Sequence, residues 1–146
     1  MEANPINKAI EYFSKLHEKL KDKELGKAFR SRARSLPSMI ESIGLVPTLS
    51  FCYGKAEADL YRSIRSSWLS EGEIKAEKKE EKGGYALYLL LTLLYLRDLE
   101  LIDERMLEEP IEAFKKLSEE ALPIASKLLM PYLVEVKRLA EAVYPE

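Results

Sequence analysis

Apolar residues recur at helical spacing along most of the chain. Asn4 and Pro5 form a cap and first-turn proline, and the apolar positions from Ile6 to Leu20 predict an amphipathic helix of about five turns. No segment alternates apolar and polar residues with period two, so no sheet is expected. We predict an all-α fold, a single-domain helical bundle of about six helices spanning residues 1–146. Further helices are expected over 25–43, 47–54, 57–69 and 85–102. A short acidic helix is expected over 104–117. A last helix is expected from about residue 119, and its apolar face begins at Leu122.

The run from Tyr85 to Leu96 is apolar on nearly all sides, which predicts a helix in the centre of the bundle. A membrane-spanning helix needs about 20 apolar residues, more than this run contains. With no signal-peptide pattern at the N-terminus, we expect a cytoplasmic protein without membrane contact.

Two features interrupt the helical pattern. Pro37 removes a backbone donor inside the second helix and should kink or divide it, and Gly44 should end it. Residues 70–84 contain many charges and one large apolar side chain, Ile74. We expect a solvated helix extension or a charged, mobile connection there, ended by the glycine pair Gly83-Gly84.

Few residues suit catalysis. The chain has one cysteine, Cys52, and one histidine, His17. A dyad of these two is an enzymatic alternative, but the apolar neighbours of Cys52 predict a raised thiol pKa and an inert group. A two-metal nuclease site is a second enzymatic alternative, because it would need a cluster of carboxylates. The chain has such a cluster, but its spacing is that of a solvated helix end; the acids are Asp98, Glu100, Asp103 and Glu104. We expect no catalytic residue, no metal site and no cofactor.

Charge is distributed unevenly along the chain. Residues 1–70 hold 12 Lys and Arg against 8 Asp and Glu, whereas residues 71–146 hold 11 against 17. The region 25–56 has one acid, Glu41, and the basic residues Lys27, Arg30, Arg32, Arg34 and Lys55. Such a segment suits a polyanion, although a solvated helix face gives the same pattern.

Helical geometry separates the basic residues. With Arg30 set at zero, Lys27 lies at about 60° and Arg34 at about 40°, so these three form one outward stripe suited to phosphate. Arg32 lies at about 200°, within the apolar arc. It is either a structural arginine paired with a buried acid or a residue re-aimed by a break in the helix. A second cationic pair, Arg62 and Arg65, is expected to point away from the apolar face of its helix.

Residues 30–55, RSRARSLPSMIESIGLVPTLSFCYGK, carry a family resemblance. An Arg-rich run is followed by Leu36-Pro37, an apolar pair, Gly44-Leu45 and a Leu-x-Phe helix that ends at Lys55. This order resembles the small all-helical subunit of type III-B CRISPR effector complexes, the fifth component of the RAMP module. Val46-Pro47 departs from the pattern and should stiffen the turn without changing the basic set.

The resemblance implies a non-catalytic, structural role. Such subunits stack along the effector complex, beside the subunits that hold the guide RNA, and contact the backbone of guide and target RNA. It implies partners among the other subunits and self-stacking. Together with the cationic stripe, we predict RNA contact first through Lys27, Arg30, Arg34 and Lys55, and then through Arg32, Arg62 and Arg65. The alternative is a protein-binding helical adaptor whose basic and acidic halves mate head to tail without RNA.

Overall fold

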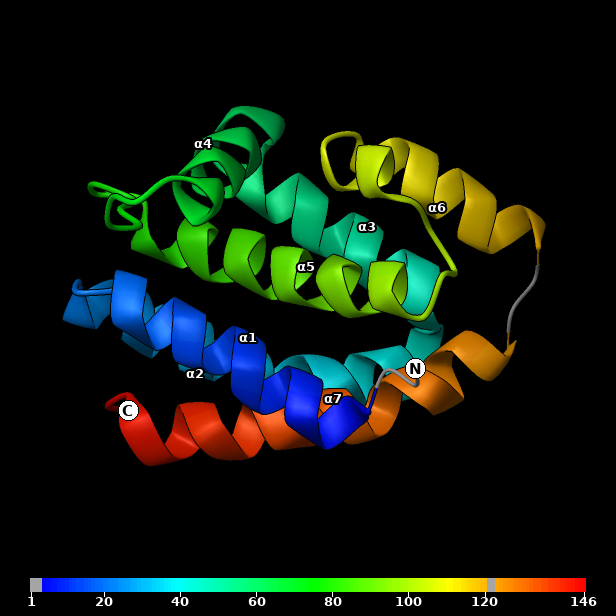
Figure 1. Ribbon diagram of the computed structural model, residues 1–146, viewed down its shortest axis with the longest axis horizontal. Coiled ribbons are helices and arrows are strands. Elements are labelled where there is room, and N and C mark those ends of the chain that lie inside the picture. Colours follow the sequence, from blue (N-terminus) through cyan, green and yellow to red (C-terminus); the bar gives the residue numbers. More distant parts are fainter. Residues whose placement is uncertain (1–3, 121–122) are drawn as a thin grey trace.

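The computed structural model describes residues 4–120 and 123–146, and in these ranges it contains seven α-helices, one short 3-10 helix and no strand (Figure 1). The all-α prediction is confirmed. The seven α-helices correspond one to one to the seven ranges expected from the sequence, one more than the stated total of about six. Within the segment 104–117, a 3-10 turn precedes the α-helix that begins at Pro110. The elements are α1 (Pro5–Lys19), α2 (Lys23–Ile43), α3 (Leu45–Ala56), α4 (Ala58–Leu69), α5 (Glu80–Asp98), η1 (Glu104–Leu107), α6 (Pro110–Glu119) and α7 (Pro123–Val143).

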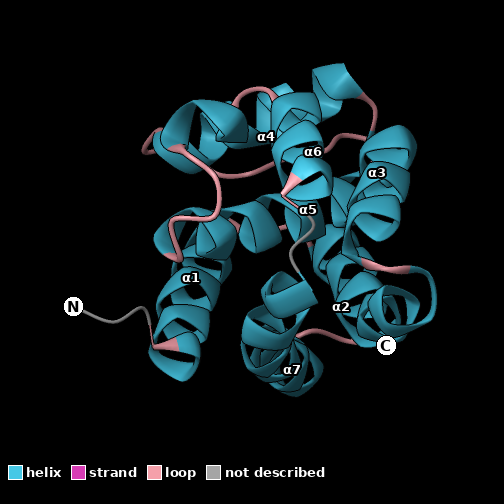
Figure 2. Ribbon diagram, turned by 90° about the vertical axis from the view of Figure 1, so that its right-hand side faces the viewer, coloured by secondary structure: helices cyan, strands magenta, loops and turns pink. Residues whose placement is uncertain are grey.

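Helix α5 occupies the centre of the bundle, as its apolar run predicts. Every residue from Ala86 to Leu96 is buried. The other helices surround α5 in the end-on view of Figure 2, and α2, α3, α4 and α7 all pack directly against it. Within the described ranges, no helix has both the length and the apolarity needed to cross a lipid bilayer.

The helix ends follow the expected capping chemistry. The Asn7 N–H donates to the side chain of Asn4 at 3.0 Å, which caps α1 beside Pro5. Gly44 separates α2 from α3 with a φ of 100°, a left-handed conformation that favours glycine. The last helix begins at Pro123, and Leu122 lies outside the described residues.

Pro37 does not divide α2, which runs without a break from Lys23 to Ile43. Of the two expected outcomes, the division is therefore wrong, and a kink at Pro37 stays a prediction. Leu36 and Ile40 on either side of the proline are buried, and this packing keeps the helix continuous although one backbone hydrogen bond is lost.

The glycine pair lies inside α5, so the expected boundary at residue 84 is also wrong. A Cβ on Gly84 would lie 2.8 Å from the carbonyl carbon of Ala28, and one on Gly83 would lie 2.6 Å from Leu25 Cδ1. The glycines are therefore needed where α2 and α5 cross at close range. The glycine pair therefore marks a close crossing of two helices and not the end of the charged connection.

The charged connection is tied to the bundle at its middle. Ile74 is fully buried, and its N–H donates to the carbonyl of Lys19 at 2.9 Å. The Lys19 ammonium in turn donates to the carbonyls of Ser70 and Gly72, at 2.5 and 2.8 Å. The mobility of the exposed residues in this connection stays a prediction.

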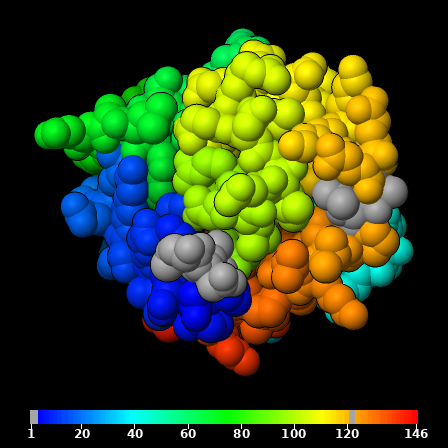
Figure 3. Space-filling model, turned by 45° about the vertical axis from the view of Figure 1, so that its right-hand side comes forward, coloured from blue at the N-terminus to red at the C-terminus, as the bar shows by residue number. Residues whose placement is uncertain are grey.

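The first and last helices pack side by side although they are far apart in the sequence. The rings of Phe13 and Tyr144 lie 5.6 Å apart, centroid to centroid, at one end of this contact. Figure 3 shows α1 in blue and α7 in orange below the yellow segment of η1 and α6. The closed arrangement gives the basic segment of α2 neighbours from both α5 and α7.

Candidate nucleic-acid interface

The predicted cationic stripe of α2 is partly neutralised by the C-terminal part of the chain. Arg30 Nη2 lies 3.8 Å from Glu146 Oε2, and its side chain is only 14% exposed. Arg34 Nε lies 3.6 Å from Glu141 Oε2 and remains 59% exposed. Lys27 is exposed and has no ion pair within the described chain. The three residues share a helix side, but only Lys27 is free of a carboxylate partner.

Lys27 instead lines an open groove between α2 and the start of α5. The groove has a volume of about 480 Å³, and Ser31 lies one turn further along α2 on the same wall. The opposite wall consists of Lys78, Lys79, Glu80, Glu81 and Lys82. Sequence reasoning missed these lysines because the mixed charges of residues 70–84 were interpreted as a solvated connection.

Arg32 has an aromatic partner rather than an acidic one. Its guanidinium carbon lies 4.6 Å from the centroid of the Tyr85 ring, and Arg32 Nη1 donates to the Tyr85 hydroxyl. Arg32 Nε is buried without a hydrogen-bond partner, and no ion pair to Arg32 exists among residues 4–120 and 123–146. Both expected explanations, a buried acid and a broken helix, are therefore wrong. A half-buried arginine on an aromatic face is a cation–π contact.

Lys55 continues this arrangement on α3. Its ammonium lies 5.6 Å from the centroid of the Phe51 ring, and Phe51 packs edge-to-face on Tyr85 with the centroids 5.7 Å apart. We call Arg32, Tyr85, Phe51 and Lys55 the cation–aromatic cluster. It joins three helices and carries two cations that have no carboxylate partner in the described chain. The sequence places Tyr85 at the start of the apolar run of the central helix, as a core or subunit contact, so it does not indicate this cluster.

Arg62 and Arg65 do not form an outward pair, so that prediction is wrong. Arg62 is exposed and pairs with Asp59 at 3.2 Å. Arg65 is only 4% exposed, and it donates to Glu108 at 2.7 Å and to Glu104 at 2.9 Å. Arg65 therefore fixes the segment after α5 to α4, and it has no free donor face toward solvent.

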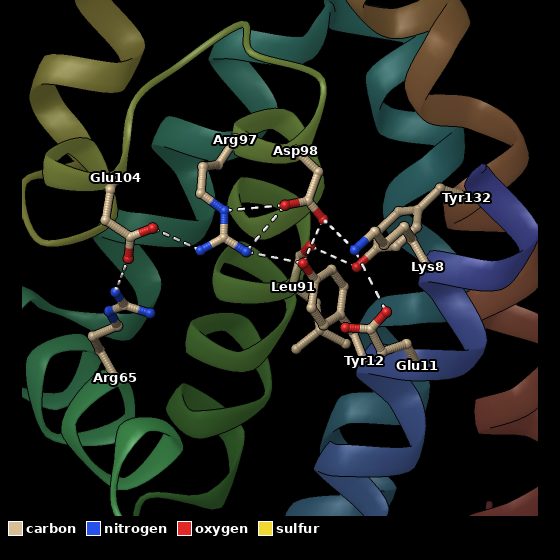
Figure 4. A network of polar contacts seen from close by, with 9 residues as sticks. All are labelled: Lys8, Glu11, Tyr12, Arg65, Leu91, Arg97, Asp98, Glu104 and Tyr132. Atoms are coloured by element: carbon tan, nitrogen blue, oxygen red, sulfur yellow. Dashed lines mark hydrogen bonds and ion pairs between the residues drawn. The ribbon is translucent and has the colours of Figure 1, made fainter. Parts of the chain in front are cut away.

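A polar network extends from Arg65 across α5 to α1 (Figure 4). Arg97 donates to Glu104 at 2.8 Å and to the Tyr12 hydroxyl at 2.9 Å. The Tyr12 hydroxyl donates to Asp98, and burial together with this carboxylate raises the pKa of Tyr12 well above its usual value. The network links helices by ion pairs, and its acids are used in these contacts.

The remaining candidates for chemistry lie apart from this network. Burial raises the pKa of the Cys52 thiol to about 12, so the thiolate needed for reactivity is absent at neutral pH. His17 is exposed, and its ring stacks on Phe13 with the centroids 6.2 Å apart. Asp103 accepts a hydrogen bond from the Met106 N–H and caps η1. In the described part of the chain, no group of His, Cys, Asp and Glu is placed to hold a metal ion.

We expect stability to fall in acid partly through Glu104. The hydrogen bond from Arg97, followed by the charges of Arg97 and Arg65, holds the pKa of this carboxyl below its usual range. Because the pKa of Glu104 is lower in the folded than in the unfolded state, the ionised carboxylate stabilises the fold. This stabilisation is complete above the unfolded pKa of about 4.3 and is lost as the pH falls through the pKa of the folded state. Thermal unfolding should show Glu104→Gln less stable than wild type at pH 7, with a smaller difference at pH 3.

The matched control is Glu77→Gln, which removes an exposed acid without an ion pair. Its difference from wild type should be small at both pH values. A Glu104→Gln difference that stays constant with pH would contradict this account of the network.

The comparisons with known proteins cover nearly the whole chain. Residues 1–143 match the family described as CRISPR-associated protein (Cas_Cmr5). The chain is 32% identical over 142 residues to the CRISPR system CMR subunit Cmr5 of Saccharolobus solfataricus, covering 92% of this chain and 90% of that protein.

Solved structures extend the similarity to three dimensions. One chain of a type III-B Cmr-beta complex bound to non-cognate target RNA matches with a TM-score of 0.87 at 29% identity, covering 99% of both chains. A chain of the Cmr-beta complex bound to cognate target RNA and AMPPnP matches with a TM-score of 0.80 at 28% identity, covering 97% of this chain and 96% of that one.

Proposed function

The chain belongs to the Cas_Cmr5 family of CRISPR-associated proteins, and we propose that it is a structural subunit of a type III-B CRISPR effector complex in antiviral defence. Its fold matches chains in two RNA-bound Cmr-beta complexes over almost their full length. The proposed partners are the other subunits of the complex and its guide and target RNA. The site of action is the cytoplasm.

The proposed role is non-catalytic. The thiol of Cys52 is buried, and the acids Asp98 and Glu104 are held in ion pairs with arginines. The buried thiol and the paired acids therefore stabilise the bundle, and they are not arranged to activate a nucleophile.

We infer that the chain contacts the RNA backbone through the side formed by α2, α3 and the start of α5. The observation that carries this proposal is that Lys27, Arg32 and Lys55 have no carboxylate within ion-pair distance in the described chain, whereas the other predicted cations have one. Phosphate binding is driven by cations that release counterions, so unpaired cations are the better candidates. Arg30 and Arg34 stay secondary candidates, because RNA would have to displace Glu146 and Glu141.

Stacking against neighbouring subunits has its own support. Large apolar side chains remain exposed at several places on the surface, including Ile43, Leu69, Ile111 and Ile124. The protein-binding adaptor without RNA ranks second, because Arg30 and Arg34 already pair with acids of the same chain and are less available to a second copy.

The double substitution Lys27→Gln and Lys55→Gln tests the RNA contact. In the reconstituted complex, RNA affinity should fall about tenfold at low salt, and the slope of log affinity against log salt should decrease by about 0.7 for each lost contact with a single strand. Thermal stability should change little, because both side chains are exposed and lack ion pairs. The measurement is a binding titration at several salt concentrations.

The matched control is Lys115→Gln with Lys116→Gln on α6, which removes the same charge from residues without ion pairs on another helix. This control should keep the wild-type slope. Equal losses in the two double variants would mean that net charge alone steers the RNA, and an unchanged slope in the first would reject the proposed surface.

A further inference from the structure

We propose that Phe51 binds an unpaired base of the RNA by stacking, with Lys55 and Arg32 beside it. The proposal rests on the RNA contact proposed above and adds a binding mode to it. Backbone contact requires only cations, whereas an exposed ring among cations is typical of proteins that hold single-stranded nucleic acid. The occupant is therefore a base in a single-stranded stretch, not a duplex.

The ring of Phe51 is accessible and held in position. Phe51 is 37% exposed although its helix packs against the central α5. The edge-to-face contact with Tyr85, at an interplanar angle of 82°, leaves at least one face of the Phe51 ring clear of Tyr85. Tyr85 is itself held by Arg32, which contacts both its ring and its hydroxyl. Phe51 therefore contacts an aromatic partner that is itself fixed by Arg32.

The charges around the ring favour nucleic acid over an apolar protein segment. Lys55 lies over Phe51 and Arg32 over Tyr85, and neither cation has an ion pair within residues 4–120 and 123–146. A base that stacks on Phe51 can displace the flexible Lys55 ammonium, which then reaches the phosphate of the same nucleotide. A buried Arg32 Nε without a hydrogen-bond partner leaves a donor unsatisfied beside the same aromatic pair.

The test is Phe51→Leu, which keeps an apolar side chain and removes the π face. The full chain is titrated with short single-stranded RNA that carries one fluorescent adenine analogue, whose emission is quenched when the base stacks. We expect about tenfold weaker binding and loss of the quenching. The salt slope should fall by no more than about 0.7, because stacking itself releases no counterions and only the Lys55 phosphate contact depends on the stacked base. Phe51→Trp should restore affinity and quenching.

Phe114→Leu is the matched control, since Phe114 is a half-buried aromatic on α6 that contacts Tyr53. It should bind as the wild type does. Wild-type affinity and quenching in Phe51→Leu would overturn the stacking proposal. Failure of Phe51→Leu to assemble into the complex, with unchanged RNA affinity, would also overturn it and assign the ring to a protein neighbour. In either case, a reduced salt slope in the Lys27→Gln and Lys55→Gln variant would leave the proposed function standing.

Discussion

The substitution Tyr132→Ala should lower the free energy of unfolding by about 3–5 kcal/mol. Tyr132 of α7 is fully buried, and its ring stacks on Tyr95 of α5 with the centroids 4.4 Å apart and the planes 9° from parallel. Its hydroxyl donates to the carbonyl of Leu91 at 2.7 Å (Figure 4). Truncation removes the ring, the stacking and the hydrogen bond, and it leaves a cavity between α5 and α7. Chemical denaturation followed by helical circular dichroism measures the change.

Tyr132→Phe separates the ring from the hydroxyl. It keeps the packing and the stacking and loses only the hydrogen bond, so we expect a loss of about 0.5–1.5 kcal/mol. If Tyr132→Ala cost no more than Tyr132→Phe, the contact between α5 and α7 would not contribute the packing energy assigned to it.

The second large effect is expected from Gly84→Leu, which should destabilise the fold by about 2 kcal/mol. A side chain there would meet the backbone of Ala28, whose carbonyl oxygen lies 2.9 Å from the Cβ position, so α2 would have to move away from α5. Overpacking of this kind costs about 3 kcal/mol, and the better helix propensity of leucine returns about 1 kcal/mol. The free energy of unfolding from a denaturant titration is the relevant measurement.

Gly54→Ala provides the control within the same protein. Gly54 lies inside α3, and apart from its chain neighbours and its own helix backbone no heavy atom lies within 4 Å of its Cβ position. The substitution should therefore stabilise the fold by up to about 1 kcal/mol. The two glycine substitutions should therefore have opposite signs. Destabilisation by both would show that backbone freedom, rather than the close approach to Ala28, accounts for Gly84.

The helices and the central position of α5 could be predicted because they depend on local spacing of apolar residues. Helical periodicity placed α1 and α4 within a few residues of their observed bounds, and the length of the apolar run indicated the buried helix. The glycine pair predicts the end of the charged connection because adjacent glycines often mark a loop, but glycines are also found where two helices cross at close range. Only the packing of α2 against α5 shows which of these two roles the glycines have.

The candidate site was less predictable because it depends on which distant residues meet. A helical wheel places Arg30 and Arg34 on one side of α2, but it says nothing of Glu141 and Glu146, which are more than a hundred residues away in the chain. A helical wheel of α4 likewise cannot show that Arg65 is buried and paired whereas Arg62 is exposed, because the partners of Arg65 come from the segment after α5. Arg32 was rightly set apart from the stripe, and its aromatic partner emerged only from the packing of α5.

The contact between α1 and α7 has a consequence for synthesis of the protein. On the ribosome, α1 emerges first but meets its partner only after residues 123–143 have been translated. At about 5–20 residues per second, the nascent α1 waits on the order of ten seconds with its apolar face uncovered. We therefore expect ribosome-bound chains that stop before α7 to be sensitive to protease and to recruit chaperones, and full-length chains to lose both properties on release.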